Sequence, residues 1–232
     1  MLYAKRVAWA AVALLGLSVT PLAVSSVFAA GAPTPIVPAP LPPAGNVEAG
    51  AEKAAVCSAC HGMNGNSTNP EWPSLAGQNA AYTREQLLLF RAGHRNDPVM
   101  YPMAIGLTDE DIADLSAYFA TQTPVGLEAD PSHWQNGSRL YHHGDSSRDI
   151  PACQACHGPV GRGNPGAAFP ALQAQHAVYT IKQLTSYADG QRYVDLTGKA
   201  TQSRNGHMMT TIAKRLTATD IRDLATYMQG LR

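Results

Sequence analysis

The 232-residue chain has little charge and few cysteines. Charged residues make up 15% of it, well below the quarter that is usual in soluble proteins, and 17 basic side chains balance 17 acidic ones. The sequence has no basic tract, which argues against a nucleic-acid partner. All four cysteines fall in two short motifs, so none is left to form a structural disulfide.

The two cysteine motifs share the form C-x-x-C-H, which is typical of covalent attachment of c-type haem. Two thiols three positions apart on one helical turn can add to the two vinyl groups of one porphyrin, and the next residue places an imidazole under the iron. A zinc site or a redox disulfide is the alternative, but neither requires a histidine immediately after the second cysteine, and both motifs have one. The sequence therefore predicts two haem c groups, attached through Cys57, Cys60, Cys153 and Cys156, with His61 and His157 as iron ligands.

The N-terminus has the pattern of an export signal. Two basic residues precede the apolar run Val7–Ala30, and Val27-Phe28-Ala29 offers small or branched residues where a signal peptidase cuts. We expect residues 1–29 to be a secretory signal peptide. An uncleaved membrane anchor is the alternative, because the run is long enough to span a bilayer. Residues 30–45 form a proline-rich leader or stalk that favours extended polyproline II. Export predicts a periplasmic protein.

The rest of the chain carries the same pattern twice. The two cysteine motifs align at an offset of 96 residues, residues 73–83 align with 170–180 at an offset of 97, and residues 107–112 align with 216–221 at an offset of 109. The second copy therefore has about twelve extra residues, which we place within Tyr193–Gly206.

This repeat predicts an all-α protein with two domains. One covers residues 46–123, here called the first half, and the other covers residues 135–232, here called the second half. Between them lies a linker, residues 124–134, in a stretch of turn formers without a clear period. Domains of this size often need a cofactor to complete the core, and haem supplies that apolar mass.

Two helices are expected in each copy. Residues 83–93 and 180–190 are amphipathic and stop at a glycine. The last helix of each half should begin with a variant of the capping box, formed by Thr108 with Asp111 and by Thr217 with Asp220. Apolar residues then recur at helical spacing and predict core positions: Ile112, Leu115, Tyr118, Phe119, Ile221, Leu224, Tyr227 and Met228. Met63, close to its own attachment motif, is also expected in the core.

Each iron needs a sixth ligand. Methionine opposite histidine is the usual ligation for electron transfer, and it raises the reduction potential. The offset of 109 residues superposes Met100 on Met209, whereas it places neither Met103 nor Met208 on a methionine. We therefore assign Met100 and Met209 as the distal ligands. The alternatives are Met103 for the first haem and Met208 or His207 for the second.

Other repeated residues suggest supporting roles. Pro73 and Pro170 would suit a loop whose carbonyl accepts the second N–H of the proximal histidine. Tyr82 and Tyr179 are predicted to hydrogen-bond near the haem or across the domain interface, or simply to pack.

The remaining histidines are expected to be solvated, namely His94, His133, His142, His143 and His176.

Two C-x-x-C-H domains in tandem, each followed by P-x-L-x-x-Q, a Y-T helix and a methionine before L-T-x-x-D-I, resemble the dihaem cytochrome c4 family. The resemblance covers residues 46–232. It implies two class I cytochrome c domains related by a pseudo-twofold axis, each built around one covalently attached haem with histidine and methionine ligands. The sequence departs from the family in its leader and in Tyr141–Pro151, an insertion before the second motif.

The resemblance implies outer-sphere electron transfer in the periplasm, from a donor such as a small copper protein or a cytochrome complex to a terminal oxidase. We do not expect an enzyme, because six-coordinate irons have no vacant site. The sparse charge predicts docking through an apolar patch with modest salt dependence.

Two other functions compete with this prediction. A dihaem redox enzyme, of the peroxidase or sulfur-compound dehydrogenase type, would need one labile iron or an unusual ligand such as cysteine. The chain has a methionine in register for each haem and no spare cysteine, which argues against both types. A subunit docked permanently to a larger complex, with membrane association through the N-terminus, is the third function class.

Overall fold

The computed structural model describes residues 44–201 and 203–232. The predicted signal peptide and most of the leader lie outside these residues. The described part is helical and has isolated β-bridges but no strands, which confirms the predicted all-α class. None of the helices in the described part is long and apolar enough to cross a membrane.

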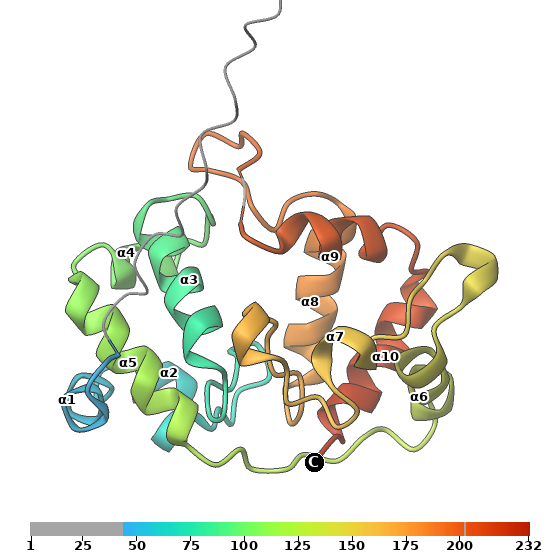
Figure 1. Ribbon diagram of the computed structural model, residues 1–232, viewed down its shortest axis with the longest axis horizontal. Coiled ribbons are helices and arrows are strands. Elements are labelled where there is room, and N and C mark those ends of the chain that lie inside the picture. Colours follow the sequence, from blue (N-terminus) through green and yellow to red (C-terminus); the bar gives the residue numbers. More distant parts are fainter. Residues whose placement is uncertain (1–43, 202) are drawn as a thin grey trace, which may run out of the picture. The chain divides into compact units, whose positions relative to one another are not determined.

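Figure 1 shows the helices of the two halves as two groups along the chain. The first half contains α1 Val47–Lys53, α2 Ser58–His61, the 3-10 turn Met63–Gly65, α3 Ala80–Arg91, α4 Met100–Ala104 and α5 Asp109–Thr121. The second half contains α6 Trp134–His143, the 3-10 turn Ser146–Arg148, α7 Gln154–His157, the 3-10 turn Pro165–Ala167, α8 Ala177–Ala188, α9 Gly206–Ala213 and α10 Ala218–Gln229.

The ends of the helices follow from local sequence. α3 and α8 end just before Gly93 and Gly190, which adopt φ values of +70° and +71° that favour glycine. Both predicted capping boxes are present: the threonine hydroxyl accepts a hydrogen bond from the aspartate N–H, and the carboxylate accepts one from the threonine N–H. These predictions are confirmed.

In each half the first helix packs closely on the last one. α1 lies against α5 and α6 lies against α10. A Cβ atom at Gly50 would lie 2.2 Å from the carbonyl oxygen of Asp114, and one at Gly137 would lie 2.0 Å from that of Asp223. Only glycine permits these approaches, so the two matching contacts hold the first and last helices of each half close together.

The predicted apolar stripes form the core. Ile112, Leu115 and Phe119 are buried in the first half, and Ile221, Leu224 and Met228 are buried in the second. Met63 does not join them, because 76% of its surface is exposed. The prediction that Met63 belongs to the core is therefore wrong. Gly62, with a φ of +75°, turns the chain immediately after α2, and Met63 begins the following turn on the outside.

Two further differences concern the second half. Tyr141, placed at the start of the predicted insertion, belongs to α6 and is fully buried, so the helix continues to His143 before the chain departs from the first half. The extra residues before α9 are where the repeat predicts them. α8 and α9 are joined by residues 189–205, whereas α3 and α4 are joined by residues 92–99.

Candidate haem sites

Each attachment motif is folded into a single helical turn. The N–H of His61 donates to the carbonyl oxygen of Cys57 at 2.9 Å, and the N–H of His157 donates to that of Cys153 at 3.0 Å. This turn brings both cysteines and the histidine of a motif to one short helix, α2 or α7. Burial raises the pKa of the Cys57 thiol, and it raises that of Cys153 to about 11.

The two motif histidines are buried and oriented by prolines. Nδ1 of His61 donates to the carbonyl oxygen of Pro73 at 2.8 Å, and Nδ1 of His157 donates to that of Pro170 at 2.9 Å, as predicted. Burial lowers the pKa of both imidazoles, although the proline carbonyls oppose the shift. A neutral ring whose Nδ1 carries the proton has its Nε2 lone pair available, which is the state that ligates a metal.

All eight residues predicted to bind haem line one cavity of about 530 Å³. Both attachment motifs contribute to it, and so do Met100 on α4 and Met209 on α9. The rest of its wall is largely apolar and comes from both halves, for example Leu87, Phe90, Leu184 and Leu224. Such a wall suits a flat apolar macrocycle.

The rival ligands have different positions. Met103 and Met208 also line the cavity, but they are 46% and 36% exposed. Met209 is half-buried and packs against the apolar clusters around Leu184 and Tyr187. His207 is exposed and does not line the haem cavity.

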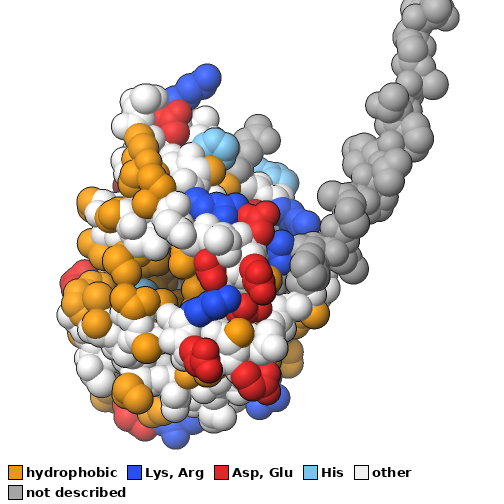
Figure 2. Space-filling model, turned by 90° about the vertical axis from the view of Figure 1, so that its left-hand side faces the viewer, with side chains coloured by type: hydrophobic (Ala, Val, Ile, Leu, Met, Phe, Trp, Pro, Cys, Tyr) orange, Lys and Arg blue, Asp and Glu red, His pale blue; other side chains and the backbone are white. Residues whose placement is uncertain are grey.

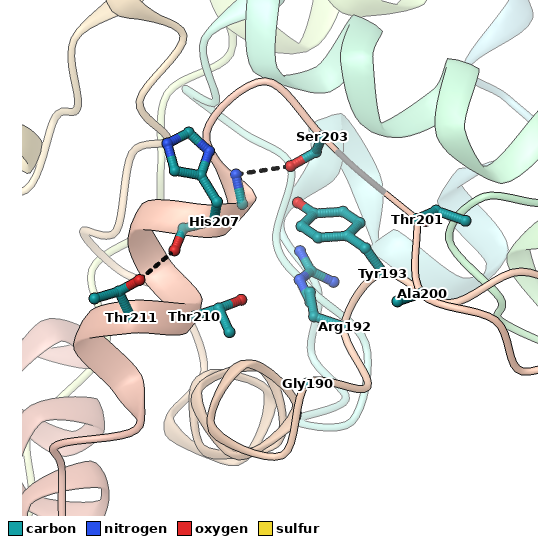
Figure 3. Close-up of a pocket in the computed structure, with 10 residues that line it drawn as sticks. Gly190, Arg192, Tyr193, Ala200, Thr201, Ser203, His207, Thr210 and Thr211 are labelled. Carbon is teal, nitrogen blue, oxygen red and sulfur yellow. Dashed lines mark hydrogen bonds between the residues drawn. The ribbon is translucent and has the colours of Figure 1, made fainter.

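A second pocket, of about 450 Å³, lies beside α9 (Figure 3). Its wall includes extra residues of the second half, and the polar side chains of Arg192, Thr201, Ser203 and His207 are among those that line it. The N–H of Gly206 donates to Oγ of Ser203 at 2.8 Å and fixes the loop where α9 begins. The inserted residues therefore build a wall at the N-terminus of the helix that carries Met209.

Two buried arginines that the sequence analysis did not identify cross between the halves. Nη2 of Arg192 donates to the Tyr82 hydroxyl at 3.0 Å, and Nη2 of Arg95 donates to the Tyr179 hydroxyl at 3.3 Å. The predicted interface role of the two tyrosines is thereby confirmed. The arginines also match at the offset of 97 residues, and this repetition in the sequence could have identified them.

The polar part of the cavity wall provides a test of fit for haem. Arg95 and Arg192 are 7% and 6% exposed and form no salt bridge within the described residues, although an unpaired buried charge is costly. Nε of Arg192, Nε2 of Gln86 and Oγ1 of Thr83 are buried there without a hydrogen-bond partner. Haem carries two carboxylates, which accept hydrogen bonds from such donors, so the residues fit the group.

Apolar side chains are exposed beside the first attachment motif. Val56, Val99 and Met103, here called the edge patch, are 61%, 52% and 46% exposed and also line the cavity. Figure 2 shows hydrophobic side chains gathered around a hollow on the side of the first half. This opening is where a haem edge would approach the surface.

Paired attachment helices, neutral buried histidines and a shared apolar cavity define a tandem c-type cytochrome. The chain matches the cytochrome c family over residues 47–123 and 135–232 and belongs to that family. It is 41% identical to cytochrome c4 of Azotobacter vinelandii over 197 residues, which cover 81% of this chain and 90% of the relative. It is 42% identical to cytochrome c4 of Pseudomonas aeruginosa over 189 residues, with the same coverage.

Among solved structures, the chain is similar to reduced recombinant cytochrome c4 from Pseudomonas stutzeri. The identity is 40%, the TM-score is 0.74, and the match covers 82% of this chain and all of that one. The resemblance to dihaem cytochrome c4 is confirmed. The protein carries two haem c groups and transfers electrons between redox partners, and it is not an enzyme.

The histidines show where sequence reasoning failed. His94 and His143 are exposed as expected, but His176 is 7% exposed and lies between the halves, where its Nε2 donates to the carbonyl oxygen of Ser67 at 2.8 Å. The prediction of a solvated His176 is wrong. In the first half its place is taken by Asn79, so no matching histidine marked this position.

Proposed function

We propose that the protein is a periplasmic electron carrier whose two irons are both closed by six ligands. His61 and Met100 ligate the iron of the first half, and His157 and Met209 ligate that of the second. When bound, each haem supplies an iron that alternates between ferric and ferrous states. The chain holds the ligands, excludes water from the site and leaves an edge exposed to partners.

The observation that carries this proposal is the state of the two proximal histidines. Both are buried, neutral and fixed through Nδ1, and both face one apolar cavity with a methionine in its wall. The packing of Met209, and the position of His207 outside the haem cavity, support methionine over histidine in the second half.

We propose a small copper protein or a cytochrome complex as the electron donor and a terminal oxidase as the acceptor. The edge patch of Val56, Val99 and Met103 supports docking through apolar contact. Residues 1–29 would direct export to the periplasm, and residues 30–45 would separate the folded part from the signal or from a membrane. The proposed domains are residues 46–123 and 135–232.

The test is the visible spectrum of the purified, dithionite-reduced protein before and after carbon monoxide, together with a haem count per chain. We expect two haems and an unchanged spectrum, because strong ligands close both irons. A band that shifts on adding carbon monoxide would show an open or labile iron. That result would overturn the proposed ligation and favour a redox enzyme of the peroxidase or sulfur-compound dehydrogenase type.

A further inference from the structure

Two glutamines at matching positions each reach into the other half. Nε2 of Gln78 donates to the carbonyl oxygen of Ala171 at 3.0 Å, and the N–H of Ala171 donates back to Oε1 of Gln78 at 2.8 Å. Gln175 makes the same pair of hydrogen bonds with Ser74, at 2.9 Å and 3.0 Å. Each side-chain amide is thus held at both ends by a single residue of the opposite half.

The residue that each glutamine holds follows the proline of the proximal histidine. The carbonyl of Pro73, which accepts from His61, and the N–H of Ser74, which donates to Gln175, belong to one planar peptide group. The orientation of one end of this group therefore fixes the other. A continuous path runs from Nδ1 of His61 through this peptide to Gln175.

The second half contains the same path in reverse. The carbonyl of Pro170 accepts from Nδ1 of His157, and the N–H of the same peptide, from Ala171, donates to Gln78. The two paths cross: the glutamine of the first half reaches the histidine of the second, and the converse holds as well. The repeat offset of 97 residues relates all the interface members of one path to those of the other.

The glutamines are held rigidly. Oε1 of Gln78 also accepts from the N–H of Asn79 at 3.0 Å, and Oε1 of Gln175 accepts from the N–H of His176 at 3.1 Å. Gln78 is 9% exposed, so water competes little for its hydrogen bonds. Each amide oxygen is therefore already aimed at the peptide of the other half.

Hydrogen bonds in such a path polarise one another. An acceptor on the N–H of a peptide makes its carbonyl a stronger acceptor, and a stronger acceptor at Nδ1 makes the imidazole more electron-rich. An electron-rich proximal ligand stabilises the oxidised iron and lowers its potential. The glutamine of one half can thus influence the iron of the other.

We propose that Gln78 and Gln175 are positioning residues that lower the reduction potential of the haem in the opposite half. Gln78 acts on the haem bound through His157, and Gln175 acts on the haem bound through His61. This inference rests on the proposed ligand role of the two histidines. It makes the docking of the halves a determinant of both potentials.

The experiment is a spectroelectrochemical titration of the two-haem protein and of its Gln175→Leu and Gln78→Leu variants. Leucine keeps the approximate shape and removes both hydrogen bonds. We expect Gln175→Leu to raise the ratio of reduced to oxidised iron at the His61 haem about two- to fivefold at fixed potential, and to change the His157 haem less. Gln78→Leu should give the opposite pattern. The proton signal of Nδ1–H in ¹⁵N-histidine-labelled protein should move at the same histidine.

A second substitution separates an effect of the glutamine on the proline peptide from a general loss of contact between the halves. Gln175→Glu keeps an oxygen that accepts from the N–H of Ser74, so the potential of the His61 haem should stay at or below that of the parent. His176→Leu is the matched control. It removes a buried hydrogen bond between the halves that touches neither proline peptide, and it should lower stability without changing the difference between the two potentials.

The proposal is overturned if each leucine variant shifts the haem of its own half, shifts both haems equally or shifts neither. It is also overturned if Gln175→Glu raises the potential as much as Gln175→Leu. The haem count and the carbon monoxide spectrum are recorded for every variant. Two haems without a response to carbon monoxide show that the ligation is intact, so a failure of this inference is distinct from a failure of the proposed ligands.

Discussion

The methionines show how much depends on single side chains in this protein. Five of those in the described residues line the haem cavity, namely Met100, Met103, Met208, Met209 and Met228, but they differ in how the chain holds them. The N–H of Met100 donates to Oδ1 of Asp97 at 2.9 Å, which fixes the first residue of α4. Met209 is packed between two apolar clusters, whereas Met103 and Met208 are more exposed. A ligand held by its surroundings loses less conformational freedom on binding.

Met100→Ala and Met209→Ala should each open one iron. We expect the substituted half to lose the absorption of its oxidised methionine–iron bond, to bind carbon monoxide when reduced, and to have a lower potential, because methionine ligation raises it. Met103→Ala and Met208→Ala are the matched controls and should leave both spectra unchanged. Binding of carbon monoxide by a control variant would show that the methionine it replaces, Met103 or Met208, is the ligand.

The terminal helices depend on their caps. In α5 and α10 an aspartate at the third position is tied to a threonine at the N-cap, and in each half a basic residue from another segment adds to this contact. Lys53 lies 2.9 Å from Asp111, and Arg148 lies 2.6 Å from Asp220. The cap therefore also joins the last helix to the segment that precedes the attachment motif.

These caps should make stability depend on pH in acid. The N–H of Thr108, then its hydroxyl and Lys53, lower the pKa of Asp111 from its ordinary 3.8 to about 2. A group whose pKa is lower in the folded state stabilises the fold above its unfolded pKa. This contribution is complete above about pH 4 and is lost as the pH falls through about 2.

Denaturant unfolding between pH 2 and pH 6 checks this. The free energy of unfolding of the parent should fall below about pH 4, and Asp111→Asn should show a shallower fall over the same range. Part of the fall should remain, because Arg148 and Thr217 outweigh burial and lower the pKa of Asp220 as well. Glu110→Gln controls for the lost charge in the first turn. An unchanged slope in Asp111→Asn would contradict the role of the cap.

The two halves form one compact unit in which each supplies contacts to the other. Four side chains that line the cavity cross between the halves, namely Gln78, Gln175, Arg95 and Arg192. His176 also crosses between them. In the proposed docking, a partner would meet this assembly at the apolar edge patch, on a chain with few charged residues. We expect electrostatic steering to be weak for such a surface, so that short-range contact dominates docking.

Electron exchange with a small copper protein should therefore depend little on salt. We expect the second-order rate constant, measured by stopped flow, to change only modestly as ionic strength rises. Val56→Ser should slow the reaction at every salt concentration, since Val56 is 61% exposed at the cavity mouth. Val125→Ser is the control, being 62% exposed but outside the cavity wall. A steep fall in rate with added salt would instead indicate charge-driven docking.

The sequence alone determined the features that depend on neighbouring residues. The cysteines and histidine of a motif share one helical turn, a capping box spans four residues, and a glycine ends a helix, so all of these could be predicted without the fold. The repeat also led to the proline carbonyls, because each lies a short loop away from its histidine.

Only the tertiary structure decided which residues meet between the halves. Gln78 and Ala171 are 93 residues apart and contact each other through the packing of two surfaces that no local pattern describes. The burial of His176 and the exposure of Met63 have the same origin, since each depends on which way its segment faces after the chain has folded. Local backbone geometry depends on adjacent residues, whereas burial is a property of the assembled molecule.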